Sequence, residues 1–170
     1  GMHNELVAWR QKLHMIPELG FDTEETAAFV KKKLEEFGVD KVEVGLAKNG
    51  VVALIHGKNE GPCIGLRADM DALPIMEVND LPHKSQNEGK MHACGHDGHT
   101  TMLLGAAKYL CETRNFSGTA VLIFQPAEEG HGGAKVMLDE GLFERYNVSE
   151  VYAIHNMPGI KKGKFAINRG

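Results

Sequence analysis

The chain contains 170 residues, which is enough for one domain with a substantial hydrophobic core. Apolar residues make up 42% of it and charged residues 25%, so the composition indicates a globular protein rather than a disordered one. The net charge of −4 comes from 19 basic and 23 acidic side chains without long blocks of either sign, which argues against a nucleic-acid partner. No stretch reaches the ~18 apolar residues needed to span a bilayer, so no membrane partner is expected.

Cysteine usage and the first residues both predict a cytoplasmic location. The three cysteines are too few and too scattered for a disulfide framework, and a reducing compartment is therefore expected. The polar segment 1–5 also lacks the apolar core of a signal peptide.

The first part of the chain predicts two helices. Apolar residues recur at helical spacing before Pro17, which stops the first helix. Asp22 or Thr23 can cap the second helix, and Gly38 can close it. The apolar positions of the two helices are Leu6, Trp9, Leu13 and Ile16, then Ala27, Val30, Leu34 and Phe37.

Segments rich in β-forming residues then alternate with helical ones. Strands are expected at 42–44, 51–55, 62–66, 120–124, 151–154 and 165–167. The unbroken apolar run 120–124 is typical of a strand buried on both faces. Helices are expected after Asp97 and over 132–140, and the polar segment 77–90 is expected to form a long loop. This alternation predicts an α/β layered domain.

Side chains that bind metals are most concentrated in the segment Met91–His99, at the mouth of a predicted helix. Side chains two apart in an extended segment share a face, so His92, Cys94 and His96 can point the same way, and Asp97 follows closely. A thiolate with imidazoles suits zinc or a similar divalent ion. Two alternatives stay open: a surface loop rich in histidine around a buried cysteine, and a cysteine nucleophile paired with His96 or His92.

Two carboxylates follow the buried strand, in the segment Gln125–Gly130. One of Glu128 and Glu129 can bind a metal while the other takes a proton from water that the metal acidifies. The alternative is an acidic turn that leads into the glycine-rich segment 130–133. That segment lacks the lysine and the spacing of a phosphate-binding loop, so nucleotide binding is not expected.

Two further patches also follow predicted strands, where the active sites of open α/β sheets gather. His155 comes directly after the strand at 151–154 and is a candidate metal ligand. Asp69 and Asp71 follow the strand at 62–66. They can bind metal, orient a ligating histidine or bond to loop amides, and the supporting roles are favoured over direct ligation.

Five segments, in order, resemble the motifs of the aminoacylase-like metallopeptidases. The nearer subgroup comprises hippurate hydrolases, plant auxin-amino-acid hydrolases and bacterial N-acyl-amino-acid deacylases. The similarity covers essentially the whole chain, and its most specific parts are the Cys-Gly-His-Asp and Pro-Ala-Glu-Glu-Gly motifs. The five segments are Leu13–Phe21, Leu66–Pro74, Met91–His99, Phe124–Gly130 and His155–Asn156.

The resemblance implies a three-layer, zinc-exopeptidase-like mixed sheet flanked by helices, with a centre of two divalent ions. The implied metal ligands are Cys94, His96, Glu129 and His155. Cys94 would bridge the ions, Glu128 would act as general base and then as proton donor, and Asp71 would support the site. Zinc or manganese is expected, and cobalt or nickel is compatible. The broader family has a histidine at the position of Asp69, so a ligand role is not carried over to this aspartate.

The reaction that the resemblance implies is hydrolysis of the amide bond of small N-acyl amino acids, of the hippurate or N-acetyl type. Family members are longer, with an inserted lid or dimerisation domain and a later segment that supplies a further histidine ligand. Residues 1–170 are therefore expected to be the first segment of an incomplete catalytic domain, without the lid domain and the C-terminal catalytic segment. The alternative is that this segment alone is a catalytically inactive metal-binding unit. A homo-oligomer also stays open, because another copy can cover a truncated surface.

Overall fold

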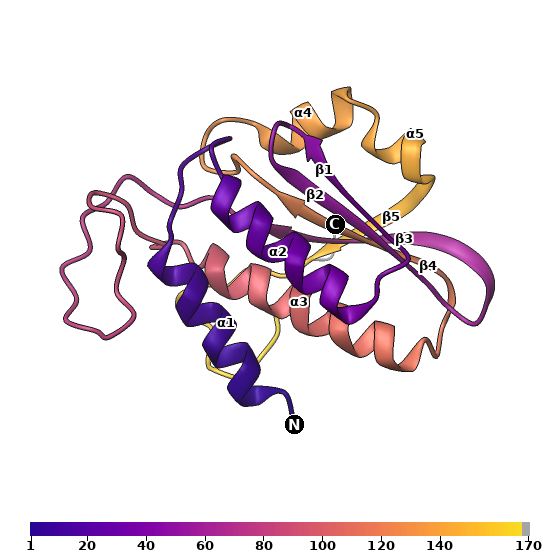
Figure 1. The fold of residues 1–170 in the computed structure, drawn as a ribbon, viewed down its shortest axis with the longest axis horizontal. Helices are drawn as coiled ribbons and strands as arrows, with labels where there is room; N and C mark the ends of the chain where they lie inside the picture. The colour runs from indigo at the N-terminus through magenta and orange to yellow at the C-terminus, as the bar shows by residue number, and fades with distance from the viewer. Residues whose placement is uncertain (168–170) are drawn as a thin grey trace.

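A five-stranded mixed sheet forms the centre of the computed structural model, which describes residues 1–167 (Figure 1). Its strands are β1 (Lys41–Leu46), β2 (Gly50–His56), β3 (Asn59–Asp69), β4 (Ser117–Gln125) and β5 (Val148–Ala153). They lie in the order β1-β2-β4-β3-β5. β2 runs antiparallel to β1 and β4, whereas β3 runs parallel to β4 and β5. The carboxyl ends of β3, β4 and β5 therefore meet at one edge of the sheet.

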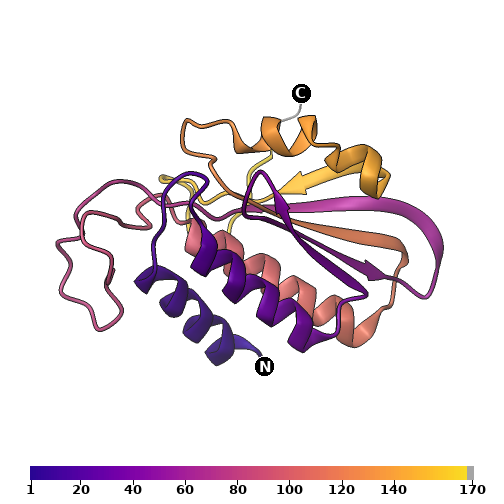
Figure 2. The same ribbon diagram turned by 45° about the horizontal axis from the view of Figure 1, so that its top comes forward.

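Helices lie on both sides of this sheet. They are α1 (His3–Met15), α2 (Glu24–Phe37), α3 (His96–Thr113), α4 (Gly133–Asp139) and α5 (Leu142–Tyr146). The first three lie on one side, and α4 and α5 lie on the other (Figure 2). The three-layer α/β architecture expected from the sequence is thus confirmed. Within the described residues, no helix has both the length and the apolar character needed to cross a membrane.

Strand β4 joins the two hydrophobic cores of the molecule. The side chains of residues 120–124 are at most 7% exposed, and successive ones point to opposite faces. Leu122 and Phe124 belong to the core on the side of α2 and α3. Val121 and Ile123 belong to the core beneath α4 and α5. Because burying one large side chain stabilises the fold by about 1.5–3 kcal/mol, this strand holds the layers together from both sides.

The start of α2 is capped differently from the sequence prediction. Thr23 occupies the N-cap position, but its side chain makes no capping hydrogen bond. Instead, the Glu18 carboxylate accepts hydrogen bonds from the backbone N–H groups of Glu25 (3.0 Å) and Thr26 (2.7 Å). A carboxylate at this place satisfies free N–H groups and complements the helix dipole. Gly38 closes the helix in the left-handed conformation, as expected.

The C-terminal part of the chain also corrects the sequence prediction. Residues 165–167 form no strand and do not join the sheet. Phe165 and Ile167 are 87% and 90% exposed, so neither is anchored in a core. The short helix α5 was not predicted, since five residues are too few to display a helical period.

The predicted loop at 77–90 contains neither helix nor strand and projects away from the layers (Figure 1). Its base is tied to the end of α1. The Gln86 N–H donates to the carbonyl oxygen of Met15 (2.9 Å), and the Asn87 side chain donates to that of Pro17 (3.0 Å). The loop is therefore fixed at its root beside the first helix.

Candidate metal centre

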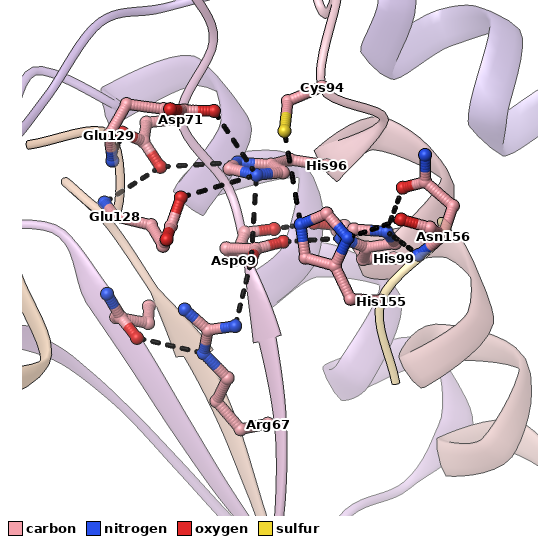
Figure 3. Close-up of polar contacts among 12 residues, drawn as sticks. Arg67, Asp69, Asp71, Cys94, His96, His99, Glu128, Glu129, His155 and Asn156 are labelled. Carbon is pink, nitrogen blue, oxygen red and sulfur yellow. Dashed lines mark hydrogen bonds and ion pairs between the residues drawn. The ribbon is translucent and has the colours of Figure 1, made fainter. Parts of the chain in front are cut away.

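All six predicted site residues converge at the sheet edge where β3, β4 and β5 end (Figure 3). They are Asp71 after β3, Cys94 just before α3, His96 at its first position, Glu128 and Glu129 after β4, and His155 after β5. Segments that are far apart in the sequence thus supply one site.

Unpartnered buried atoms mark the centre of this site. The His96 side chain is fully buried, and neither of its ring nitrogens has a hydrogen-bond partner in the described part of the chain. The buried Oε1 atom of Glu129 is unpartnered in the same sense. Cys94, His96 and Glu129 each offer one ligand atom within 4.8 Å of the other two. Because each unpaired buried polar atom costs about 1–3 kcal/mol, the arrangement fits a divalent cation that these atoms coordinate.

Carboxylates surround the His96 ring. Nε2 lies 3.6 Å from oxygens of Asp69, Glu128 and Glu129. Nδ1 lies 3.4 Å from Oδ1 of Asp71. Burial alone would lower the pKa of His96, but the neighbouring carboxylates outweigh it and raise that pKa. Four acids around one imidazole make a negative site that attracts cations.

Asp71 holds the two glutamates in place. It is fully buried, and its oxygens accept hydrogen bonds from the backbone N–H groups of Glu128 and Glu129, each at 3.0 Å. Burial would raise the pKa of Asp71, but the nearby imidazole of His96 and the hydrogen bonds from these N–H groups lower it overall. The preceding Ala127 has a φ of 57°, which is uncommon for a residue other than glycine. This turn and the Asp71 carboxylate together direct both acidic side chains to the site.

Cys94 faces His155, with its Sγ 3.9 Å from Nε2 of that ring (Figure 3). Burial and the carboxylates of Glu129 and Glu128 raise the pKa of the thiol to about 11. Such a thiol is protonated at neutral pH, whereas a cysteine nucleophile needs a lowered pKa. His92 is 4% exposed, and burial lowers its pKa to about 4, but it makes no hydrogen bond to Cys94 within residues 1–167. The geometry therefore favours metal ligation over a cysteine nucleophile.

A second set of acid and imidazole groups lies beside the first. Its ligand atoms, also within 4.8 Å of one another, belong to Asp69, His96, His99 and His155. Both oxygens of Asp69 already accept hydrogen bonds, Oδ1 from His99 Nδ1 (2.7 Å) and Oδ2 from Arg67 (2.8 Å). Burial would raise the pKa of Asp69, but His99, His96 and Arg67 lower it to about 2. Asp69 is thus an ionised, hydrogen-bonded group that is suited to support rather than to ligation.

His99 is a residue of the site that the sequence prediction missed. It lies three residues after His96, and this spacing places both rings on one face of α3, which is the signal that could have found it. Asp97 shows the opposite error, because the sequence groups it with the ligands. Its carboxylate instead faces α1, where it accepts a hydrogen bond from His14 (2.7 Å) and pairs with Arg10 (3.0 Å).

The fold and the donor set define a metal-binding α/β protein with its site at the carboxyl ends of parallel strands. The chain belongs to peptidase family M20/M25/M40, whose sequence profile matches residues 65–170. This assignment confirms the resemblance to the aminoacylase-like metallopeptidases.

Several relatives are similar over nearly the whole chain. Hippurate hydrolase of Campylobacter jejuni is 51% identical over 99% of this chain and 44% of its own length. IAA-amino acid hydrolase ILR1-like 2 of Arabidopsis thaliana is 51% identical over 97% of this chain and 37% of its own length. N-acetylcysteine deacetylase of Bacillus subtilis is 41% identical over 99% of this chain and 44% of its own length. The chain therefore spans less than half the length of these relatives.

A solved structure is similar in both sequence and fold. The YXEP protein of Bacillus subtilis, described as a dinuclear metal binding peptidase from the M20 family, superposes with a TM-score of 0.88 and 43% sequence identity. The match covers 93% of this chain and 44% of that protein. The expected fold is therefore shared with a relative that is known to bind two metals.

Proposed function

We propose that the chain is the metal-binding part of an enzyme that hydrolyses the amide bond of N-acyl amino acids. The observation that carries the proposal is that His96 and Glu129 present buried, unpartnered atoms near the thiol of Cys94, among the residues described. The names of the relatives support the substrate class, because hippurate and N-acetylcysteine are both N-acyl amino acids.

The residues that would hold two divalent ions are Cys94, His96, Glu129 and His155. Sulfur, nitrogen and oxygen donors together suit zinc or manganese, and cobalt or nickel is compatible. When bound, such ions supply Lewis acidity, which lowers the pKa of water and polarises an amide carbonyl. The dinuclear relative supports the count of two ions.

Glu128 is the proposed acid–base group. Its side chain is 38% exposed, and its Oε2 atom lies 3.6 Å from His96 Nε2, so it is both accessible and close to the ligands. As a carboxylate, it takes a proton from the attacking water while the water oxygen bonds to the amide carbonyl carbon. It then gives this proton to the amine nitrogen as the C–N bond breaks, and it ends each cycle ionised. Asp71 is the supporting residue, since it holds the backbone N–H of Glu128.

Residues 1–170 are proposed to be the first segment of a catalytic domain that continues in a longer enzyme. A second proposal is that this segment alone binds metal without catalysis. The exposure of His155 and of the whole segment 154–167 favours it, because catalysis requires closely positioned groups from which water is excluded.

Metal analysis and hydrolysis assays test these proposals. In the enzyme of full length, Glu128→Gln should keep its metal and lose turnover by about 10²–10⁴-fold, while the exposed control Glu144→Gln should change neither. Turnover that survives in Glu128→Gln would remove Glu128 as the base, and a wild-type protein without bound divalent ions would overturn the metal centre. For residues 1–170 alone, bound metal without cleavage of hippurate or N-acetylcysteine would support the second proposal.

We also propose that the enzyme is cytoplasmic and that its partner is the small-molecule substrate. Cell fractionation tests the location. Light scattering tests whether the protein forms a homo-oligomer.

A further inference from the structure

We propose that His99 is a positioning residue that sets the place of His155 by holding Asn156. The inference rests on the proposed function in one respect, namely that His155 is a metal ligand. It adds a role for His99, Asp69 and Asn156, none of which is a proposed ligand.

The segment that carries His155 needs an anchor outside the sheet. The register between β3 and β5 ends with the pair Arg67 and Ala153, so His155 lies two residues beyond the last strand pairing. Residues 154–167 are all exposed and form neither helix nor strand. Backbone pairing therefore does not fix the direction in which the His155 ring points.

Asn156 supplies this anchor by contacting His99. Its backbone N–H donates to Nε2 of His99 at 3.0 Å, and its side-chain oxygen Oδ1 lies 2.5 Å from the same nitrogen. His99 can accept there because its other nitrogen, Nδ1, donates to Asp69 (2.7 Å). Figure 3 shows the His99 ring beside both Asn156 and His155.

His99, which Asn156 contacts, is itself held in place by hydrogen bonds to buried groups. Asp69 is fully buried on β3, where Arg67 donates to its Oδ2 at 2.8 Å. Thr100, the residue after His99, donates its hydroxyl to the Asp69 carbonyl oxygen at 2.9 Å. His99 itself is 3% exposed. The contact is thus fastened to the carboxyl end of β3 through two hydrogen bonds to Asp69, one from His99 and one from Thr100.

The close approach of Asn156 to Gly95 is a second observation that the Asn156 side chain has a defined position. A Cβ atom at Gly95 would lie 2.6 Å from Oδ1 of Asn156, so the Asn156 side chain lies directly against the backbone of Gly95. Gly95 also has a φ of +96°, which disfavours other residues. Because Gly95 stands between Cys94 and His96, Asn156 docks directly on the segment that carries two of the proposed ligands.

This docking fixes the chemistry of the His155 ring as well as its place. Nδ1 of His155 donates to the carbonyl oxygen of Asn156 at 2.6 Å. The proton therefore stays on Nδ1, and Nε2 is left free on the side of Cys94, 3.9 Å from Sγ. If His99 did not hold Asn156, neither the position of the His155 ring nor the location of its proton on Nδ1 would be fixed.

Metal titration of four variants tests the inference. His99→Phe keeps a ring but removes the acceptor, and Asn156→Ala removes the side-chain contact on an exposed segment where folding is not at risk. His99→Phe should weaken divalent-ion affinity by about 10–100-fold, as supporting residues of metal sites do, and Asn156→Ala should weaken it less. His155→Ala serves as the reference for a lost ligand, and the exposed His56→Gln serves as the control that should change nothing.

A double-variant experiment with His155→Ala distinguishes a positioning role of His99 from a general loss of structure. In the His155→Ala background, His99→Phe should cause no further loss of affinity, because its effect passes through the ring that has been removed. An equal loss in both backgrounds, or wild-type affinity in both His99→Phe and Asn156→Ala, would overturn the inference. Wild-type affinity in His155→Ala would instead overturn the proposed ligand set.

Ring ¹⁵N chemical shifts of the metal-free protein give a readout that needs no ion. His155 should be a single tautomer with its proton on Nδ1 in the wild type and should average between tautomers in His99→Phe and Asn156→Ala. An averaging His155 ring in the wild type would contradict the inference even if metals bind as proposed.

Discussion

Two polar clusters, each around a buried histidine, meet at the first turn of α3, and they differ in how their hydrogen bonds are satisfied. The first contains the proposed metal ligands Cys94, His96 and Glu129 and is called the ligand cluster. The anchoring cluster consists of Arg10, His14, Glu77 and Asp97. His14 uses both ring nitrogens, with Nδ1 2.7 Å from Asp97 and Nε2 3.0 Å from Glu77. His96 uses neither in a hydrogen bond within the described residues.

The comparison teaches that residue type alone does not separate a binding site from a structural one. Both clusters combine a buried imidazole with at least one carboxylate, and His96 and Asp97 are even adjacent in the chain. Neighbouring helix positions point in different directions, so one turn of α3 serves a site on one side and a helix contact on the other. Substitutions in the anchoring cluster should therefore change the free energy of unfolding, and substitutions in the ligand cluster should change metal binding.

The largest expected effect comes from His14→Ala in the anchoring cluster. The side chains of His14, Asp97 and Glu77 are all at most 4% exposed, so the change leaves two acids with fewer partners in a buried place. We expect a loss of about 3 kcal/mol in the free energy of unfolding, at the low end of the range for broken buried pairs, because Arg10 and Ser85 still contact the acids. Urea denaturation measures this loss.

The matched control for that change is His3→Ala, which removes an exposed imidazole from the same helix. It should leave the urea midpoint unchanged. Metal affinity should also be unchanged in His14→Ala. A fall in affinity as large as that of a ligand variant would erase the distinction between the two clusters.

A slightly smaller effect is expected from Cys94→Ser in the ligand cluster. The metal-free variant should be as stable as the wild type, because within residues 1–167 the hydrogen bond of the thiol is a long contact with His155 (3.9 Å). The wild type should gain about 2.7 kcal/mol when free zinc is at ~100 times its dissociation constant, and the variant should gain little. Thermal unfolding with and without a chelator measures the gain. Cys63→Ser, the same change outside the cluster, should behave as the wild type does.

The sequence alone is enough to predict that the residues of the ligand cluster lie close together, because each of them is in a short segment beside the end of a strand or helix. Cys94 and His96 are two residues apart, and Glu129 directly follows a strand whose apolar run is unmistakable. The α/β layers follow from the same alternation of strands and helices.

The remaining features depend on contacts that no local pattern displays. The role of His99 needs Asn156, which is 57 positions away in the chain. The anchoring role of Asp97 needs His14, which is 83 positions away. The cap of α2 comes from Glu18, outside the usual capping position, because the chain turns back before the helix begins. Such pairings are set by tertiary packing, so spacing and residue type cannot reveal them.

The smallest effect is the pH dependence of the anchoring cluster, which Glu77→Gln tests. Burial would raise the pKa of Glu77, but hydrogen bonds from His14, Ser85 and Asn79 lower it from 4.5 to about 2. Because the folded-state pKa lies below the ordinary value, ionised Glu77 stabilises the fold fully above pH 4.5, and this contribution disappears as the pH falls towards 2. Glu77→Gln should therefore be about 1.5 kcal/mol less stable than the wild type at pH 7. The urea midpoints of the wild type and Glu77→Gln, measured at decreasing pH, should converge below pH 4.5. A difference that stays constant with pH would show that Glu77 acts through packing instead of charge.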